Sequence, residues 1–433
     1  MSITRPLLSL AILVLPAAQP SAAQERVVLE DFETAPADRW SKAADPIERL
    51  GEAARTGESG GRWNPGPGSS AIRTAIPEDW RSFAALRFSV RPHAAPTALV
   101  ERTLEVRVRE RGGRHAWWRK VSVPAGEWTE VELPLWRFRQ AGSPRWTEME
   151  SLALAARAPG PIDLDDMVLV PGSAGEASHV LPDEEGLGYA FPDRAYVRRV
   201  HRKGPFRLFT DAREVDAGLF LDEMESLYGD FRRIFAVEEP PPVAPFDLFL
   251  YREESDYRSL FPGLVRRLYS AELAPPEADG MSVGYLAASS HDPGQPLGRP
   301  VFLHEMTHCL LGYHLRLPSN GNWLQEGAAT LMQNAKRPQP DLDEQIQKML
   351  EEKNHVPLAR LFEAERLRPG PLYLQAMTFL EFLRAGERAG SFASFVAGWR
   401  EGKKTGELSR ELLGLSGDDL DRAWLEFCRE KYR

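Results

Sequence analysis

The feature that most constrains this chain is an H-E-x-x-H string at residues 304–308, inside a largely apolar run at 301–313. The run predicts a helix, on which residues four apart lie on one face. His304 and His308 would then present two imidazoles to one point, at a spacing that suits tetrahedral zinc. Glu305 lies off that face, within reach of water at the metal. Alone, the string also fits a buried helix, and the residues that follow distinguish the two readings.

A third zinc ligand has two candidates in the sequence. His314 lies six residues after His308, as in the metzincin pattern H-E-x-x-H-x-x-G-x-x-H. That pattern places glycine where this chain has Leu311, and Gly312 comes one position late. The competing reading of His314 is a solvated residue at a helix C-terminus, where the helix dipole favours a partly positive imidazole.

The second candidate is Glu326, eighteen residues after His308. Asn322 and Gln325 read as a capping box, which places Glu326 in the first turns of a second helix. The loop at 315–321 contains proline, asparagine and glycine, so the second helix can fold back beside the first. This arrangement resembles that of the gluzincins, whose second zinc helix carries a W-L-x-E-G string with the glutamate as ligand. The resemblance favours Glu326 over His314 and implies a zinc site of His304, His308 and Glu326.

Length, charge and the N-terminus place the chain in a broad class. At 433 residues, two or three domains are expected. A net charge of −9 argues against a nucleic-acid partner, which normally requires a basic face. Residues 1–23 read as a signal peptide with Arg5, an apolar core and a Ser-Ala-Ala cleavage site, so a periplasmic or secreted protein is expected. No membrane anchor is expected after cleavage, and the oligomeric state stays open.

The two cysteines, Cys309 and Cys428, admit two interpretations. Export permits a disulfide between the zinc helix and the last helix. Alternatively, both are buried thiols that pack as small hydrophobic side chains.

Residues 24–172 show short strands of period two and no helical period. In one of them Leu104, Val106 and Val108 alternate with charged residues. The expected strands are 27–32, 84–90, 104–108, 115–123, 128–133, 151–156 and 162–170. Glycine- and proline-containing turns separate several of them, which favours an antiparallel β-sandwich.

The segments L-E-D-F-E at 29–33 and I-D-L-D-D-M at 162–167 resemble those of galactose-binding-like jelly rolls. The resemblance covers about a third of the chain and implies carbohydrate binding, such as to a cell-envelope glycan. Asp31 with Asp165 or Asp166 is a candidate Ca²⁺ site, although turn residues explain these aspartates equally well. Four tryptophans are candidates for stacking on sugar rings, with core packing as the alternative: Trp117, Trp118, Trp136 and Trp146.

Residues 173–193 are rich in Gly, Pro, Asp and Glu and read as a linker. From 194 to 433 the chain resembles the bacterial gluzincins of the peptidase MA-like group. The resemblance rests on the H-E-x-x-H string, W-L-Q-E-G at 323–327, a strand-helix-strand lead-in and Y-L-Q-A at 373–376. It implies an α+β zincin-like metallopeptidase domain with a helical subdomain at its end. No G-A-M-E-N string precedes the zinc helix, so an endopeptidase is favoured over an aminopeptidase. Thr330 also stands where thermolysin-like members carry an aspartate.

The resemblance assigns further roles in hydrolysis of a peptide or protein substrate. Zinc lowers the pKa of a bound water to about 7, and Glu305 would serve as its general base. Tyr373 is the candidate oxyanion donor, with Tyr285 or His355 behind it, and a packed side chain is the alternative for each. The segment 283–288, with Gly284 and Tyr285, is expected to bind the substrate backbone as an added strand.

A function of another class fits the same sequence. The protein would then be an envelope- or carbohydrate-binding protein in which the zinc site is structural or inactive. Glu305 favours catalysis, because a purely structural site needs no base at that position.

Overall fold

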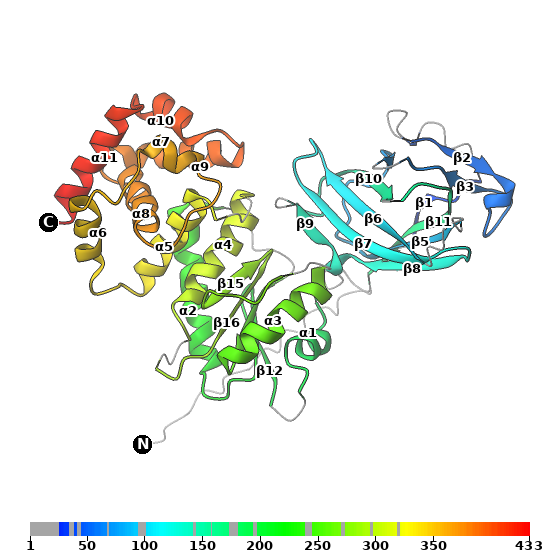
Figure 1. The fold of residues 1–433 in the computed structure, drawn as a ribbon, viewed down its shortest axis with the longest axis horizontal. Helices are drawn as coiled ribbons and strands as arrows, with labels where there is room; N and C mark the ends of the chain where they lie inside the picture. Colours follow the sequence, from blue (N-terminus) through cyan, green and yellow to red (C-terminus); the bar gives the residue numbers. More distant parts are fainter. Residues whose placement is uncertain are drawn as a thin grey trace, which may run out of the picture.

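The structure is a computed structural model of the chain (Figure 1). It describes residues 26–33, 39–40, 45–66, 69–93, 101–141, 144–156, 158–172, 181–193, 197–238, 245–269, 273–294, 298–317 and 321–433. The expected signal peptide at 1–23 lies outside these residues.

The N-terminal domain is an antiparallel β-sandwich of two sheets, as expected. One sheet has the order β2-β3-β11-β5-β8, with β1 also paired to β11, and the other has the order β4-β10-β6-β7-β9. The strands of the first sheet are β1 (Val27–Glu30), β2 (Ile47–Leu50), β3 (Gly60–Trp63), β5 (Phe83–Pro92), β8 (Thr129–Pro134) and β11 (Ile162–Pro171). Those of the second are β4 (Ser70–Arg73), β6 (Glu101–Glu110), β7 (Ala116–Pro124), β9 (Arg139–Ala141) and β10 (Met149–Ala156).

The alternation seen in the sequence sets which side chains enter the sandwich core. Leu104, Val106 and Val108 on β6 are fully buried, and the charged residues between them face outward. Trp117 and Trp146 are also core residues, with stacked rings 4.6 Å apart. These two tryptophans therefore cannot offer a face to a sugar, because their stacking surfaces are already used for packing.

The carboxylate of Asp163 on β11 is fully buried and is held by three bases. It lies 2.8 Å from Arg62 Nε, 2.6 Å from Arg91 Nη2 and 2.8 Å from His93 Nε2. Burial by itself would raise the pKa of Asp163, but the hydrogen bonds from Arg62, His93 and Arg91 outweigh it and hold that pKa below its ordinary value of 3.8. The ionised carboxylate therefore stabilises the folded sandwich.

The pH dependence of stability should show this contribution. Because the folded-state pKa is lowered, the contribution is complete above pH 3.8 and is lost as the pH falls through the folded-state value. Asp163→Asn should lower the free energy of unfolding at pH 7 by about 2–4 kcal/mol, and by progressively less at acid pH. Urea unfolding at several pH values measures this. Asp79→Asn, which removes an exposed ion pair with Arg81, is the control and should change little.

The second domain is built on a five-stranded mixed sheet of order β12-β13-β14-β16-β15. Its strands are β12 (Arg199–Lys203), β13 (Phe206–Thr210), β14 (Phe246–Tyr251), β15 (Gly280–Val283) and β16 (Leu286–Ser290). Side chains such as Leu208 and Leu248 pack toward α2 (Ala217–Ile234) and α4 (Val301–Leu315). Side chains of the other face, such as Phe209 and Phe249, pack toward α1 (Asp183–Ala190) and α3 (Glu254–Tyr269).

The expected linker at 173–193 needs a correction in its second half. Residues 181–193 include α1, whose Ala190 is buried, and the neighbouring Leu181 and Phe191 are buried in the same core as Tyr251. This half of the segment therefore belongs to the second domain. Residues 173–180 lie outside the described residues.

The remainder of the chain is helical and packs around α8 (Pro371–Leu383), in the upper left of Figure 1. Its helices are α5 (Trp323–Lys336), α6 (Leu342–Glu351), α7 (Leu358–Glu363), α8 (Pro371–Leu383), α9 (Ala389–Arg400), α10 (Thr405–Leu413) and α11 (Asp418–Lys431). No helix in the described part of the chain is both long and apolar enough to span a bilayer.

The disulfide interpretation of Cys309 and Cys428 is wrong for this structure, because both are free thiols. Each is fully buried, and Cys428 lies beside Thr378 of α8. Burial raises the pKa of Cys428 to about 12 and that of Cys309 well above its ordinary value. The alternative interpretation, two buried thiols that pack as small hydrophobic side chains, agrees with this placement.

Candidate metal centre

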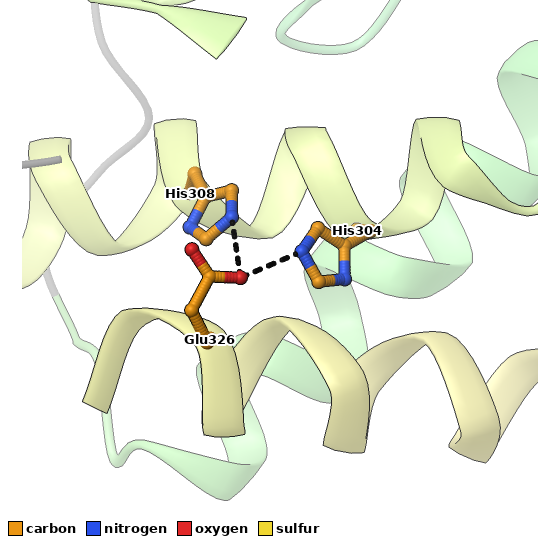
Figure 2. A group of neighbouring side chains, drawn as sticks. All are labelled: His304, His308 and Glu326. Atoms are coloured by element: carbon orange, nitrogen blue, oxygen red, sulfur yellow. Dashed lines mark hydrogen bonds and ion pairs between the residues drawn. The ribbon is translucent and has the colours of Figure 1, made fainter. Parts of the chain in front are cut away.

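Helix α4 carries the H-E-x-x-H string and is buried on nearly every side. It starts after Pro300 and ends at Arg316, which has a left-handed φ of 57°. The four-residue spacing places the rings of His304 and His308 on one face, with centroids 4.8 Å apart. Both rings point from α4 toward α5 (Figure 2).

Helix α5 brings Glu326 to the two histidines. Asn322 caps this helix as predicted, because its side chain accepts hydrogen bonds from the backbone N–H groups of Leu324 and Gln325. Glu326 Oε2 lies 3.1 Å from His304 Nε2 and 3.6 Å from His308 Nε2. The candidate ligand atoms of these three side chains all lie within 4.8 Å of one another. In the part of the chain that the structure describes, no other cluster of three or more His, Cys, Asp or Glu side chains meets this condition.

The electrostatics of this group fit a cation. Burial disfavours a charge on His308, yet its hydrogen bond to Glu326 and the charges of Glu305 and Glu326 raise its pKa to about 9. Burial would raise the pKa of Glu326, but the hydrogen bonds from His304 and His308 hold it well below its usual range. Two nitrogens and one carboxylate oxygen are a ligand set that zinc accepts.

Gln325 orients one of the two histidines, a role that sequence reasoning missed. His308 Nδ1 lies 2.9 Å from Gln325 Oε1, and Gln325 Nε2 donates to the carbonyl of Leu317 at 3.3 Å. A carbonyl oxygen can only accept, so Nδ1 of His308 carries a proton. In the neutral form of the ring, which is the form that binds a metal, Nε2 then presents its lone pair to the site. The capping-box reading assigned the Gln325 side chain to the helix start, where the structure does not place it.

Glu305 lies at the junction of α4 and the edge strand β15. Ser282 Oγ donates a hydrogen bond of 2.7 Å to Glu305 Oε2. The helix and strand approach so closely that a Cβ on Gly280 would come within 2.7 Å of Val301 and 3.1 Å of Glu305. Glycine at 280 therefore permits the contact that places the carboxylate of Glu305 beside β15. Sequence reasoning missed Ser282 as well.

A cleft of about 660 Å³ runs past His304 and Glu305. The Ala278–Asp279 segment before β15 lines one part of it, and one face of α6 and the first turn of α8 line another. Tyr373, in that first turn, stacks on the His304 ring at 6.1 Å. Burial and the hydrogen bond to Glu326 raise the pKa of Tyr373 far above its ordinary value, so its hydroxyl stays a donor.

The other two candidate oxyanion donors lie elsewhere. The His355 ring packs edge-on against Trp424 at 5.6 Å, and it does not line the cleft. Tyr285 donates from its hydroxyl to the carbonyl of Pro144 in the sandwich, at 3.4 Å.

The expected substrate strand at 283–288 also needs a correction. Gly284 has a left-handed φ of 62°, and with Tyr285 it forms the turn of a hairpin between β15 and β16. Tyr285 contacts the sandwich and does not line the cleft. The strand beside the cleft is therefore β15 at Gly280–Val283, and Gly284 and Tyr285 are removed from the candidate substrate-binding residues.

His314 is excluded as a ligand by its position. It is fully buried, and its Nε2 lies 3.0 Å from the Tyr228 hydroxyl on α2. Six residues after His308, at about 100° per residue, it points to another side of α4. The helix continues to Leu315, without the early stop that the metzincin pattern requires. The reading of His314 as a solvated residue is wrong too.

Among the described residues, the candidate calcium ligands do not form a group like that of His304, His308 and Glu326. Asp165 accepts backbone hydrogen bonds from Arg55, Thr56 and Asp166, and Asp31 accepts one from Glu33. These bonds account for the aspartates as turn and loop residues.

The chain was compared with known protein families, curated proteins and solved structures. No protein-family model matches it, and no curated protein does. Among solved structures it is similar to a family 11 carbohydrate-binding module of the cellulosomal cellulase Lic26A-Cel5E of Clostridium thermocellum, with 16% identity and a TM-score of 0.28. That match covers 35% of this chain and 97% of the module.

Two further matches are of the same kind. The C-terminal family 22 carbohydrate-binding module of Clostridium thermocellum Xyn10B is 11% identical, with a TM-score of 0.24, over 33% of this chain and 92% of that one. An E78R mutant of a family 29 carbohydrate-binding module is 13% identical, with a TM-score of 0.25, over 34% and 90%. With TM-scores below 0.3, these likenesses carry no inference about a ligand.

Proposed function

We propose that this protein is an exported zinc-dependent peptidase. The observation that carries the proposal is the convergence of His304, His308 and Glu326 beside a cleft that also exposes Glu305. A structural zinc site is usually closed by four protein ligands, whereas a catalytic one has three and an open position. Three ligands, a neighbouring carboxylate and an open cleft are the parts that hydrolysis requires.

Each residue of the site has a separate role in hydrolysis. Zinc held by the three ligands would supply a Lewis acid that polarises the scissile carbonyl and activates water. Glu305 takes the proton of the attacking water and passes it to the leaving amine. The Tyr373 hydroxyl, in the first turn of α8, donates a hydrogen bond to the oxyanion. Ser282 holds one oxygen of Glu305 and leaves the other for the proton.

The free edge of β15 suits an extended peptide. In its hairpin with β16, Val283 pairs with Leu286 across a two-residue turn. The backbone groups of Val283 and Met281 then bond to β16, and those of Gly280 and Ser282 face the opposite side. In the described residues, β15 is the last strand of its sheet on that side. A substrate could therefore pair with Gly280 and Ser282 and pass directly beside Glu305.

The test uses the purified chain from residue 24 onward. Elemental analysis should find about one zinc per chain, and casein or an unstructured peptide should be cleaved internally. A chelator should abolish cleavage, and added zinc should restore it. A protein that carries its zinc and cleaves no peptide would favour the alternative of a binding protein with a structural metal.

A second role, glycan binding by the sandwich, is favoured by one observation. Trp118 on β7 lies half-buried among the cations Lys120 and Arg139, at 5.4 and 5.1 Å from its ring. Trp118 alternates with the core residue Trp117, so it faces away from the sandwich core. An aromatic ring among polar side chains is suited to stack on a sugar. Trp118→Ala should then abolish binding on a glycan array, with the buried Trp117 left intact. Wild-type protein that binds no glycan would exclude this role.

A further inference from the structure

The sandwich contacts the C-terminal end of α4, the helix that carries His304 and His308. Arg145, in the segment before β10, places its guanidinium 5.3 Å from the Tyr313 ring and donates to the Tyr313 carbonyl at 3.3 Å. The adjacent Pro144 accepts the hydrogen bond from Tyr285. Tyr313 and Tyr285 pack edge to face at 5.5 Å. The sandwich therefore meets the second domain where α4 ends, one to two turns beyond His308.

Glu110, the last residue of β6, is the charged centre of this contact. Its side chain is 2% exposed and accepts a hydrogen bond from the Arg145 backbone N–H. It also forms an ion pair with Arg316, the residue that ends α4. A buried carboxylate with a cation from the other domain fixes the geometry of both, because either charge left alone there would be costly.

Arg316 stands in a strained backbone position. Its left-handed φ of 57° is unfavourable for a residue with a Cβ, and such positions persist only where the surroundings hold them. The ion pair with Glu110 supplies that hold. The next residue, Leu317, is thereby fixed: its N–H bonds to the Leu311 carbonyl at 3.4 Å, and its own carbonyl accepts the hydrogen bond from Gln325.

These contacts form a continuous path from the sandwich to a zinc ligand. Glu110 anchors Arg316, the backbone at Arg316 sets the Leu317 carbonyl, and that carbonyl holds the Gln325 amide. Gln325 in turn fixes the tautomer and direction of the His308 ring. Each step is a hydrogen bond, an ion pair or a covalent neighbour.

We propose that Glu110 is a positioning residue for the metal centre and that the sandwich is in this way part of the zinc site. The inference rests on the proposed zinc site and not on peptide hydrolysis. It goes beyond a sandwich that only targets the protein, because loss of the anchor would loosen His308 from another domain.

The experiment measures zinc affinity of the full mature chain by competition with a chromophoric chelator. Glu110→Gln keeps the shape and an acceptor for the Arg145 N–H, but it lacks the charge that holds Arg316. We expect zinc to bind about 3- to 10-fold more weakly, less than the 10- to 100-fold usual for a direct partner of a ligand. Arg137→Ala is the matched control, since it removes sandwich contacts to Glu185 and Tyr189 of α1, neither of which belongs to the path. It should change affinity less than about 2-fold.

A double-mutant cycle tests the path itself. If Glu110 acts through Gln325, then Glu110→Gln should weaken zinc binding much less in a Gln325→Ala background than in the wild type. Any of three results would overturn the proposal. They are native zinc affinity in a folded Glu110→Gln variant, an equal loss of zinc affinity in Arg137→Ala, and fully additive effects of the two substitutions in the cycle. A wild-type chain that binds no zinc at all would instead refute the proposed function.

A second pair of variants keeps the test decisive if Glu110→Gln does not fold. Arg316→Ala loses the anchor and keeps the unfavourable left-handed φ, whereas Arg316→Gly loses the anchor at a residue that adopts this φ freely. The alanine variant should bind zinc more weakly than the glycine variant, by about 3-fold or more. Equal, native affinity in both would show that Arg316 does not position the site.

Discussion

Glu326→Ala is expected to lose most of its zinc, from about one equivalent per chain to well under half. Glu326 is the one carboxylate of the metal group, with an oxygen 3.1 Å from His304 Nε2 and 3.6 Å from His308 Nε2. Its removal leaves two imidazoles, too few for stable zinc binding. It also removes the negative charge that favours a cation in this buried position. Elemental analysis of protein dialysed against metal-free buffer measures the result.

His314→Ala is the matched control for Glu326→Ala. It removes an imidazole from the same helix, but one that contacts Tyr228 and lies outside the metal group. This variant should retain its zinc, although the cavity left at a fully buried site should lower thermal stability. Zinc lost from His314→Ala and kept by Glu326→Ala would mean that the ligand set is wrong.

The convergence of His304, His308 and Glu326 could be predicted because its determinants are local. The spacing of His304 and His308 fixes their common face in any helix. Asn322 fixes the start of the next helix, α5, which lies beside α4. A wrong candidate, His314, matched a pattern by count alone. The helical phase, at about 100° per residue, was the signal against it.

The residues that orient the site could not be predicted because their roles depend on how separate elements pack. Ser282 reaches Glu305 only because β15 lies against α4 at Gly280. Glu110 lies 206 residues before its partner Arg316, and no local pattern links them. Helix α1 is different. Pro182 followed by three acidic residues is a helix start signal, and the low apolar content of the segment obscured it.

The hairpin turn illustrates how one glycine changes the location of a site. Apolar residues on both sides of Gly284 predicted one strand, but a left-handed φ at this glycine divides it into β15 and β16. The division moves the strand beside the cleft to Gly280–Val283 and carries Tyr285 to the sandwich. A glycine within an apolar run is thus as consistent with a turn as with a strand.

Glu305→Gln is expected to keep its zinc and to lose peptide hydrolysis by about 10²- to 10⁴-fold, the usual contribution of a positioned general base. Glutamine keeps the volume of the side chain and can still accept the hydrogen bond from Ser282, but it cannot take a proton. Glu305 belongs to the cleft lining and not to the metal group, so zinc content should not change. Turnover of a quenched fluorescent peptide, normalised to bound zinc, measures the effect.

Ser282→Ala separates the position of the base from its presence. This variant keeps a carboxylate at Glu305 and removes the hydrogen bond that fixes its direction. It should lower kcat by about 3- to 30-fold, far less than Glu305→Gln, because a free carboxylate still reaches the water for part of the time. Ser282→Thr, which restores the hydroxyl, should recover part of the rate.

If Glu305→Gln turned over peptide at the wild-type rate, the measured activity would come from another site or from a contaminant. In that case the zinc centre would be better explained as structural.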